Sequence, residues 1–237
     1  MRRGLAASRA EGASLIAGGR VLVSGSVAQK PAHQVSASEP IVLAGPPARF
    51  VSRGGEKLDA ALGHFGVLVA GREVLDAGAS TGGFTDCLLQ RGAKLVVAVD
   101  VGHGQLHPRL RADPRVEVME RVNVRHLGPA ALGGRRFELV TADLSFISLK
   151  TVAPALSSVA KPGADLVVLV KPQFEAGRAE VSRGRGIVRD PEVWQRALGD
   201  VASAFSALGA VPTGQVPSPL AGADGNREFF LHLRMAG

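Results

Sequence analysis

The chain has 237 residues, 46% of them hydrophobic, which is enough for one substantial core and a small additional unit. Its formal net charge of +7 favours an anionic polymer as partner, although genome composition explains the excess of arginine over lysine more readily than a binding site does. The single cysteine excludes an intrachain disulfide, and no Cys/His cluster has zinc spacing, so we expect a cytoplasmic protein without bound metal. The longest aliphatic runs, near 95–99 and 166–170, are far too short to span a bilayer, so we expect no membrane association.

The first 45 residues predict a small separate unit. A short helix through Leu15 and Ile16 ends at Gly18–Gly19, and residues 20–27 are typical of a strand, a tight turn and a second strand. Such a unit is too small for a large core, but it can present basic side chains. From charge alone, a solvated basic face and a binding surface are equally favoured.

The residue pattern of this unit is more specific than its charge. It resembles the S-four-type RNA-binding domain through Arg3, Ala6, Ser8, Arg9, Gly12, Leu15, Ile16, Gly19, Arg20, Val21, Val23 and Gly25. The resemblance covers roughly residues 1–45 and implies RNA contacts from basic side chains. The candidates are Arg2, Arg3, Arg9, Arg20, Lys30 and, beyond the unit, Arg53. The paired prolines of segment 46–52 predict a linker to a second domain at 53–237.

From Phe50 onward the pattern alternates between strand and helix. Helical stretches are predicted at 149–159 and 191–208, and late β-rich runs at 209–216 and 228–234. Earlier predicted strands each end near a polar residue, namely Asp76, Asp100, Asp143 and Lys171. The alternation predicts an α/β fold with a Rossmann-like, doubly wound, mostly parallel sheet, whose ligands bind at the carboxyl ends of the strands.

The most informative stretch is residues 74–85 followed by 95–100, which predicts a strand, a glycine loop, a helix, a second strand and an acidic end. Three glycines, at positions 78, 82 and 83, allow the backbone to turn tightly and approach a ligand. Asp100 falls where the ribose of a nucleotide would be bound. A nucleotide-containing cofactor is therefore one interpretation of this stretch, and a purely structural βαβ unit is another.

Three ligand or catalytic interpretations compete for the loop. Its glycines do not follow the G-x-G-x-x-G spacing, which disfavours a nicotinamide or flavin. The loop also contains G-x-S-x-G, and Ser80, Asp143 and His232 follow the order of a hydrolase triad, but a nucleophile elbow lies after several strands of its sheet. The third interpretation is S-adenosylmethionine, whose methyltransferases use a similar glycine loop between two acidic residues.

Four polar residues in separate motifs indicate a catalytic centre. Three of them have a structural alternative when taken singly: an exposed side chain for Lys57, a helix cap for Asp143 and an edge-strand charge for Glu228. Lys171 directly follows five aliphatic residues, where a lysine is uncommon unless it is paired or functional. Together the four resemble the K-D-K-E tetrad of ribose 2′-O-methyltransferases of the FtsJ/RrmJ type.

Combined with the S-four-type amino terminus, segments 51–57, 76–85 and 171–175 resemble the TlyA family over nearly the whole chain. The resemblance implies a class I S-adenosylmethionine-dependent methyltransferase that modifies cytidine 2′-hydroxyls in 16S rRNA, 23S rRNA or both. Its partners would be ribosomal RNA or ribosomal subunits, with no obligate protein partner. TlyA proteins have also been described as hemolysins, an activity that a chain without a membrane span does not support.

The resemblance also implies roles for individual residues. Lys171 would contact or deprotonate the ribose hydroxyl, with Asp143 orienting it and Glu228 balancing charge beside Lys57. Asp100 would bind the ribose of the cofactor, and Asn123 would face its adenine. The remaining cofactor residues would be Asp76 and, on the methionine side, Gly78, Ser80, Gly82, Gly83 and Phe84.

Overall fold

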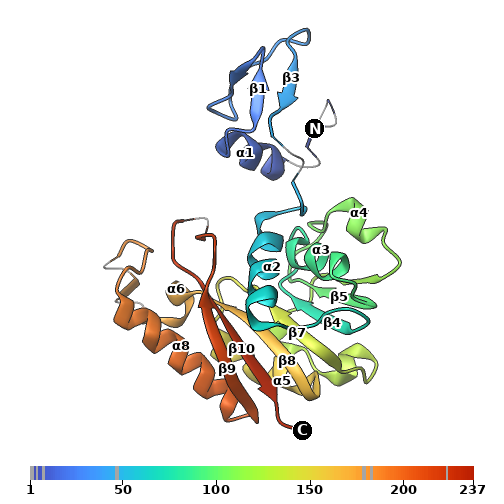
Figure 1. The fold of residues 1–237 in the computed structure, drawn as a ribbon, viewed down its shortest axis with the longest axis vertical. Coiled ribbons are helices and arrows are strands. Elements are labelled where there is room, and N and C mark those ends of the chain that lie inside the picture. Colours follow the sequence, from blue (N-terminus) through green and yellow to red (C-terminus); the bar gives the residue numbers. More distant parts are fainter. Residues whose placement is uncertain are drawn as a thin grey trace. The chain divides into compact units, whose positions relative to one another are not determined.

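The computed structural model describes residues 3, 5–6, 9–45, 48–177, 180–181, 184–222 and 224–237. The chain divides into two compact units, Met1–Arg49 and Phe50–Gly237 (Figure 1). The division falls inside the predicted linker 46–52, whose own limits stay a prediction. Each unit has its own buried hydrophobic residues.

The first unit combines one helix with a small antiparallel sheet. Helix α1 spans Arg9–Ala17, and the strands β1 (Val21–Val23), β2 (Ser26–Val27) and β3 (Ile41–Leu43) pair in the order β2-β1-β3. The helix and the first two strands were predicted from the sequence and are confirmed. Strand β3 was not predicted, because its three residues are too few to show an alternating pattern.

The second unit is built on a single sheet. Its described residues form seven strands in the order β6-β5-β4-β7-β8-β10-β9. The strands are β4 (Glu73–Ala77), β5 (Leu95–Val99), β6 (Val116–Met119), β7 (Phe137–Ala142), β8 (Ala160–Val170), β9 (Ala210–Pro217) and β10 (Phe229–Met235). The first five run parallel, whereas β10 is antiparallel to both β8 and β9. The predicted α/β fold with a mostly parallel sheet is confirmed.

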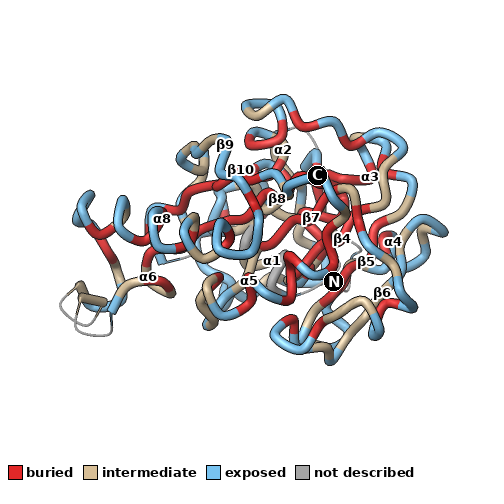
Figure 2. Tube along the Cα trace, turned by 90° about the horizontal axis from the view of Figure 1, so that it is seen from below, coloured by how far each residue is buried: buried red, intermediate tan, exposed pale blue. Residues whose placement is uncertain are grey.

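Helices cover both faces of this sheet. They are α2 (Arg53–Phe65), α3 (Gly83–Gln90), α4 (Pro108–Arg111), α5 (Leu149–Ser158), α6 (Pro172–Glu175) and α8 (Pro191–Ser206), with short 3-10 helices η1 (Val124–His126) and η2 (Pro129–Leu132). Buried residues continue through the central strands, as the red parts of the tube show (Figure 2). On β8, Val167 and Leu169 pack with α2 and α3, whereas Leu166 and Val168 pack with α5 and α8. The continuous aliphatic run of β8 is therefore explained by burial on both faces.

The strand order reverses at β4. From this strand the chain first proceeds outward through β5 and β6, and it then returns to β7 on the other side of β4. In doubly wound sheets, ligands bind beyond the carboxyl ends of the strands at such a reversal. Asp100, Asp143 and Lys171 directly follow β5, β7 and β8, so all three lie at this edge.

We predict that a protein consisting of residues 50–237 folds without the first unit. Among the described residues, neither of its two buried clusters includes a side chain from residues 1–49. Circular dichroism should show a cooperative thermal transition within about 3 °C of the corresponding transition in the full chain, a shift of roughly 1 kcal/mol for a unit of this size. A broad, non-cooperative melt would contradict this independence.

Candidate active site

The glycine loop after β4 lies directly against the end of β7. Gly78 has φ of +87°, and a Cβ at this position would lie 2.3 Å from the carbonyl oxygen of Asp143. Ser80 also has a left-handed φ of +48° although it carries a side chain, and it is exposed. Only glycine fits at position 78, because any side chain would push the loop away from the strand that carries Asp143.

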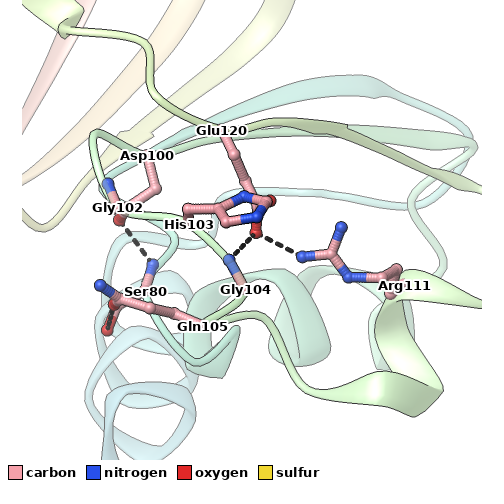
Figure 3. Close-up of polar contacts among 8 residues, drawn as sticks. All are labelled: Ser80, Asp100, Gly102, His103, Gly104, Gln105, Arg111 and Glu120. Carbon is pink, nitrogen blue, oxygen red and sulfur yellow. Dashed lines mark hydrogen bonds and ion pairs between the residues drawn. The ribbon is translucent and has the colours of Figure 1, made fainter.

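Asp100 connects the glycine loop to the end of β5. Its Oδ2 accepts a hydrogen bond from the amide of Ser80 at 2.8 Å, and its Oδ1 accepts one from the amide of Gly102 at 2.6 Å (Figure 3). The residue is partly exposed, and each carboxylate oxygen has a further lone pair for a ligand. Asp100, the acidic residue expected from the sequence, is thus fixed beside the glycine loop.

Asp76 is fully buried beneath the loop. Its Oδ2 accepts a hydrogen bond from the hydroxyl of Thr85 at 2.6 Å, and its Oδ1 one from Thr141 at 3.4 Å. Burial raises the pKa of Asp76 to about 7 despite the hydrogen bond from Thr85. In this conformation the carboxylate ties α3 to strands β4 and β7, so Asp76 supports the loop from below.

The four residues of the predicted catalytic centre form two ion pairs. Nζ of Lys171 lies 2.6 Å from Oδ1 of Asp143 and donates a hydrogen bond to Oγ of Ser145 at 2.9 Å. Nζ of Lys57, on α2, lies 2.6 Å from Oε2 of Glu228, and both residues are buried.

The two pairs belong to neighbouring strands. Phe229 is paired with Val170 in the antiparallel ladder, so Glu228 is level with Lys171. In the parallel ladder between β7 and β8, Ala142 is paired with Val168, which brings Asp143 to the same edge. The edge therefore combines two lysines and two carboxylates taken from distant parts of the sequence.

The segment after Lys171 is tied to the loop after β7 at a second point. Glu175 is buried, and its carboxylate accepts hydrogen bonds from the hydroxyl of Ser148 at 2.5 Å and from the amide of Leu149 at 2.7 Å. Sequence reasoning assigned no role to Ser145 or Glu175. The only signal was the position of Glu175 inside the motif at 171–175.

Two other predicted cofactor residues have structural contacts. Phe84 is 3% exposed and its ring stacks on Phe230, with 6.0 Å between the centroids. Oδ1 of Asn123 accepts a hydrogen bond from the amide of Arg125 at 3.0 Å and caps η1. Their roles in cofactor binding stay predictions.

The predicted RNA-binding residues differ in whether their basic groups are already hydrogen-bonded within the protein. Arg3 donates hydrogen bonds to the carbonyl oxygens of Ser36 at 2.7 Å and Ala37 at 3.0 Å, and Nε of Arg20 donates to that of Ala44 at 3.1 Å. These two guanidinium groups stabilise the first unit. Arg3 is nevertheless exposed, as are Arg9, Lys30 and Arg53, whereas Arg20 is partly buried and Arg2 lies outside the described residues.

The hydrolase interpretation of the glycine loop is wrong. Nε2 of His232 lies 2.9 Å from Oδ1 of Asp165, and Nδ1 lies 2.7 Å from Oγ1 of Thr213. Asp143 is paired with Lys171 instead of a histidine. The residue order Ser80, Asp143, His232 therefore does not correspond to a triad in space.

The described residues show neither a metal site nor a membrane span. In the part of the chain that the structure describes, no group of three or more His, Cys, Asp or Glu side chains is arranged to hold a metal ion. Among the helices of the described ranges, none combines the length and the apolar character needed to cross a bilayer.

Known families match both units. The FtsJ-like methyltransferase family matches residues 50–235, and the S4 domain, the RNA-binding domain expected from the sequence, matches residues 2–41. A Mycobacterium tuberculosis protein named 16S/23S rRNA (cytidine-2'-O)-methyltransferase TlyA is 53% identical over 235 residues, which cover 99% of this chain and 87% of the relative. The chain belongs to the TlyA family of FtsJ-like methyltransferases.

Solved structures agree with this TlyA-family assignment. The structure of a candidate hemolysin from Streptococcus thermophilus has a TM-score of 0.82 and 40% identity, covering 99% of this chain and 86% of that one. An N-methyltransferase, NodS from Bradyrhizobium japonicum in complex with S-adenosyl-L-homocysteine, has a TM-score of 0.54 at 14% identity, covering 78% of this chain and 89% of that one. The second likeness shows that the fold is that of a class I methyltransferase.

We predict that Asp76→Asn makes the protein more stable than wild type at pH 8 but not at pH 5. The pKa of Asp76 is raised from 3.8 to about 7 on folding, so its protonated form favours the folded state, and this contribution is lost progressively as the pH rises from 3.8 to about 7. The neutral amide keeps the contact with Thr85 and carries no buried charge.

Thermal unfolding of both proteins between pH 5 and pH 8.5 is the measurement. Asp200→Asn, which changes an exposed carboxylate, is the control. A constant difference in melting temperature between wild type and Asp76→Asn across this range would show that Asp76 does not titrate on folding.

Proposed function

We propose that this TlyA-family chain is an S-adenosylmethionine-dependent methyltransferase that acts on cytidine 2′-hydroxyls of 16S rRNA, 23S rRNA or both. One observation carries the proposal: the buried Lys171 is paired with Asp143 at the sheet edge that also holds Asp100 and the glycine loop. The Mycobacterium tuberculosis relative whose name specifies this reaction supports the choice of substrate.

The residues around the glycine loop fit the cofactor. The carboxylate of Asp100 offers acceptor oxygens for a ribose diol, and its two amide contacts fix its orientation. The absence of a side chain at Gly78 keeps the loop backbone against Asp143, so a ligand held by the loop would lie beside the catalytic edge. We assign Gly78, Ser80, Gly82 and Gly83 to the methionine part of the ligand. When bound, S-adenosylmethionine supplies an electrophilic methyl group.

Lys171 is the group that we assign to the RNA hydroxyl. Asp143 and Ser145 fix its Nζ, which can therefore hold the 2′-oxygen in one orientation. A ribose hydroxyl is a poor nucleophile at neutral pH, so its proton must be removed during attack. Lys171 is paired with Asp143 as an ammonium, so it accepts the hydroxyl proton only after it has given one of its own protons to Asp143 or to solvent. The pair of Lys57 and Glu228 keeps a second lysine and its balancing carboxylate fixed on the neighbouring strand.

The first unit supplies RNA contacts in this proposal. The S4 domain match covers residues 2–41, and Arg9 and Lys30 are exposed on this unit. Basic side chains contact phosphates without reading sequence, so this unit would position the RNA while the sheet edge carries out the reaction. Ribosomal RNA or a ribosomal subunit would be the partner, in the cytoplasm, with no obligate protein partner.

We predict that Lys171→Ala lowers the methyl-transfer rate by roughly 10²-fold or more while cofactor affinity stays nearly unchanged, which is the usual scale for a positioned proton acceptor. Lys171→Arg should not restore the rate. Arginine keeps the positive charge beside Asp143 but is effectively never deprotonated. Single-turnover methylation of a ribosomal RNA substrate, with bound cofactor confirmed for each variant, is the measurement.

Lys150→Ala is the matched control for this experiment, because Lys150 is paired with Asp200 on the surface of α5 and α8. It should react at the wild-type rate. Near-normal rates in both Lys171 variants would assign this lysine a purely structural role.

A further inference from the structure

A single carboxylate holds the segment that follows Asp100. Glu120 comes directly after β6, and its Oε1 accepts a hydrogen bond from the amide of Gly104 at 2.8 Å (Figure 3). The same oxygen is paired with the guanidinium of Arg111, and Oε2 lies 2.8 Å from Nδ1 of His103. One side chain thus gathers donors from three positions of the segment 101–111.

The burial of this cluster is uneven. The side chain of Glu120 is 13% exposed, whereas those of His103 and Arg111 are 63% and 42% exposed. The carboxylate therefore lies under its partners, which fold over it from the outside. An acidic group in such a position is held by its donors and in turn restricts them.

The same segment controls the orientation of Asp100. The amide of Gly102 donates to Oδ1 of Asp100, and the carbonyl oxygen of Gly102 accepts from the amide of Arg121 at 3.0 Å. A Cβ on Gly102 would lie 3.0 Å from Oδ1 of Asp100, so the turn passes close to this carboxylate. Gly102 is thereby fixed between Asp100 and the residue that follows Glu120.

We propose that Glu120 is a positioning residue for the cofactor site: it holds residues 101–107 so that the amide of Gly102 keeps the carboxylate of Asp100 aligned for its ligand. This inference rests on the proposed function, because it concerns the affinity for S-adenosylmethionine. Without Glu120, the segment would have to be ordered when the ligand binds, which lowers affinity. Methyl transfer from the bound cofactor should be unaffected, because the partners of Glu120 in the described chain are Gly104, His103 and Arg111.

The test compares Glu120→Ala and Glu120→Gln with Glu117→Ala as the control. Glu117 lies on β6 and is paired with an arginine too, Arg135, but it has no contact with residues 101–107 among the interactions of the described chain. Asp100→Ala serves as the reference for a damaged cofactor site. Calorimetry with S-adenosylmethionine, hydrogen exchange of residues 101–107 without ligand, and single-turnover rates at saturating cofactor are measured for each protein.

For Glu120→Ala we expect a dissociation constant about tenfold higher, the scale of a lost hydrogen bond to a charged group. Hydrogen exchange at the amide of Gly104 should become faster. The single-turnover rate at saturating cofactor should stay within about twofold of wild type, because Glu120 does not contact the proposed catalytic residues. Glu120→Gln should show a smaller loss of affinity, because its amide oxygen still accepts from Gly104. It also keeps the experiment informative if the alanine variant unfolds.

The outcomes separate the two proposals. Failure of the wild type to bind S-adenosylmethionine would overturn the proposed function itself. If the wild type binds, Asp100→Ala binds weakly and both Glu120 variants bind as tightly as the wild type, the positioning role of Glu120 is wrong. An equal loss of affinity in Glu117→Ala would also overturn the positioning role of Glu120, because any disturbance of β6 would then weaken cofactor binding.

Discussion

Two ion pairs at the carboxyl edge of the sheet, one buried and one partly exposed through Asp143, are the constraint on which the site depends. Removing an ammonium and a carboxylate from water is costly, and the cost is offset only by a partner in good geometry. Lys171 is therefore fixed by Asp143, and Lys57 by Glu228. Asp143 and Lys171 directly follow β7 and β8, Glu228 directly precedes β10, and Lys57 lies on α2, so neither pair can form until these elements have assembled.

A second set of carboxylates supports this edge without contributing to its catalytic pairs. Asp76 ties α3 to the strands beneath the glycine loop, Glu175 ties the segment after Lys171 to the start of α5, and Glu120 holds the segment after Asp100. Each accepts hydrogen bonds from groups on another element. The segments that carry the proposed chemistry are thus restrained by these hydrogen bonds, which favours the precise positioning of reacting groups that methyl transfer requires.

The fold could be predicted because it follows local patterns, whereas Lys57 and Glu228 were identified as site residues only through the resemblance to the K-D-K-E tetrad. An aliphatic run that ends in a polar residue places Asp100, Asp143 and Lys171 at one edge of a parallel sheet. The partners of Glu120 and Glu175 are backbone amides 16 and 26 residues away, and no periodicity encodes such contacts. Residue order alone was misleading for His232, whose ring is held by Asp165 and Thr213.

The central claim is that this chain methylates ribosomal RNA through Lys171. Mapping of 2′-O-methylated cytidines in ribosomal RNA tests it most directly, in cells that lack the chain and in the same cells supplied with wild type or Lys171→Ala at equal protein levels. The account predicts that at least one modified cytidine is lost without the chain and returns with the wild type alone. Unchanged modification in cells lacking the chain, or full restoration by Lys171→Ala, would contradict it.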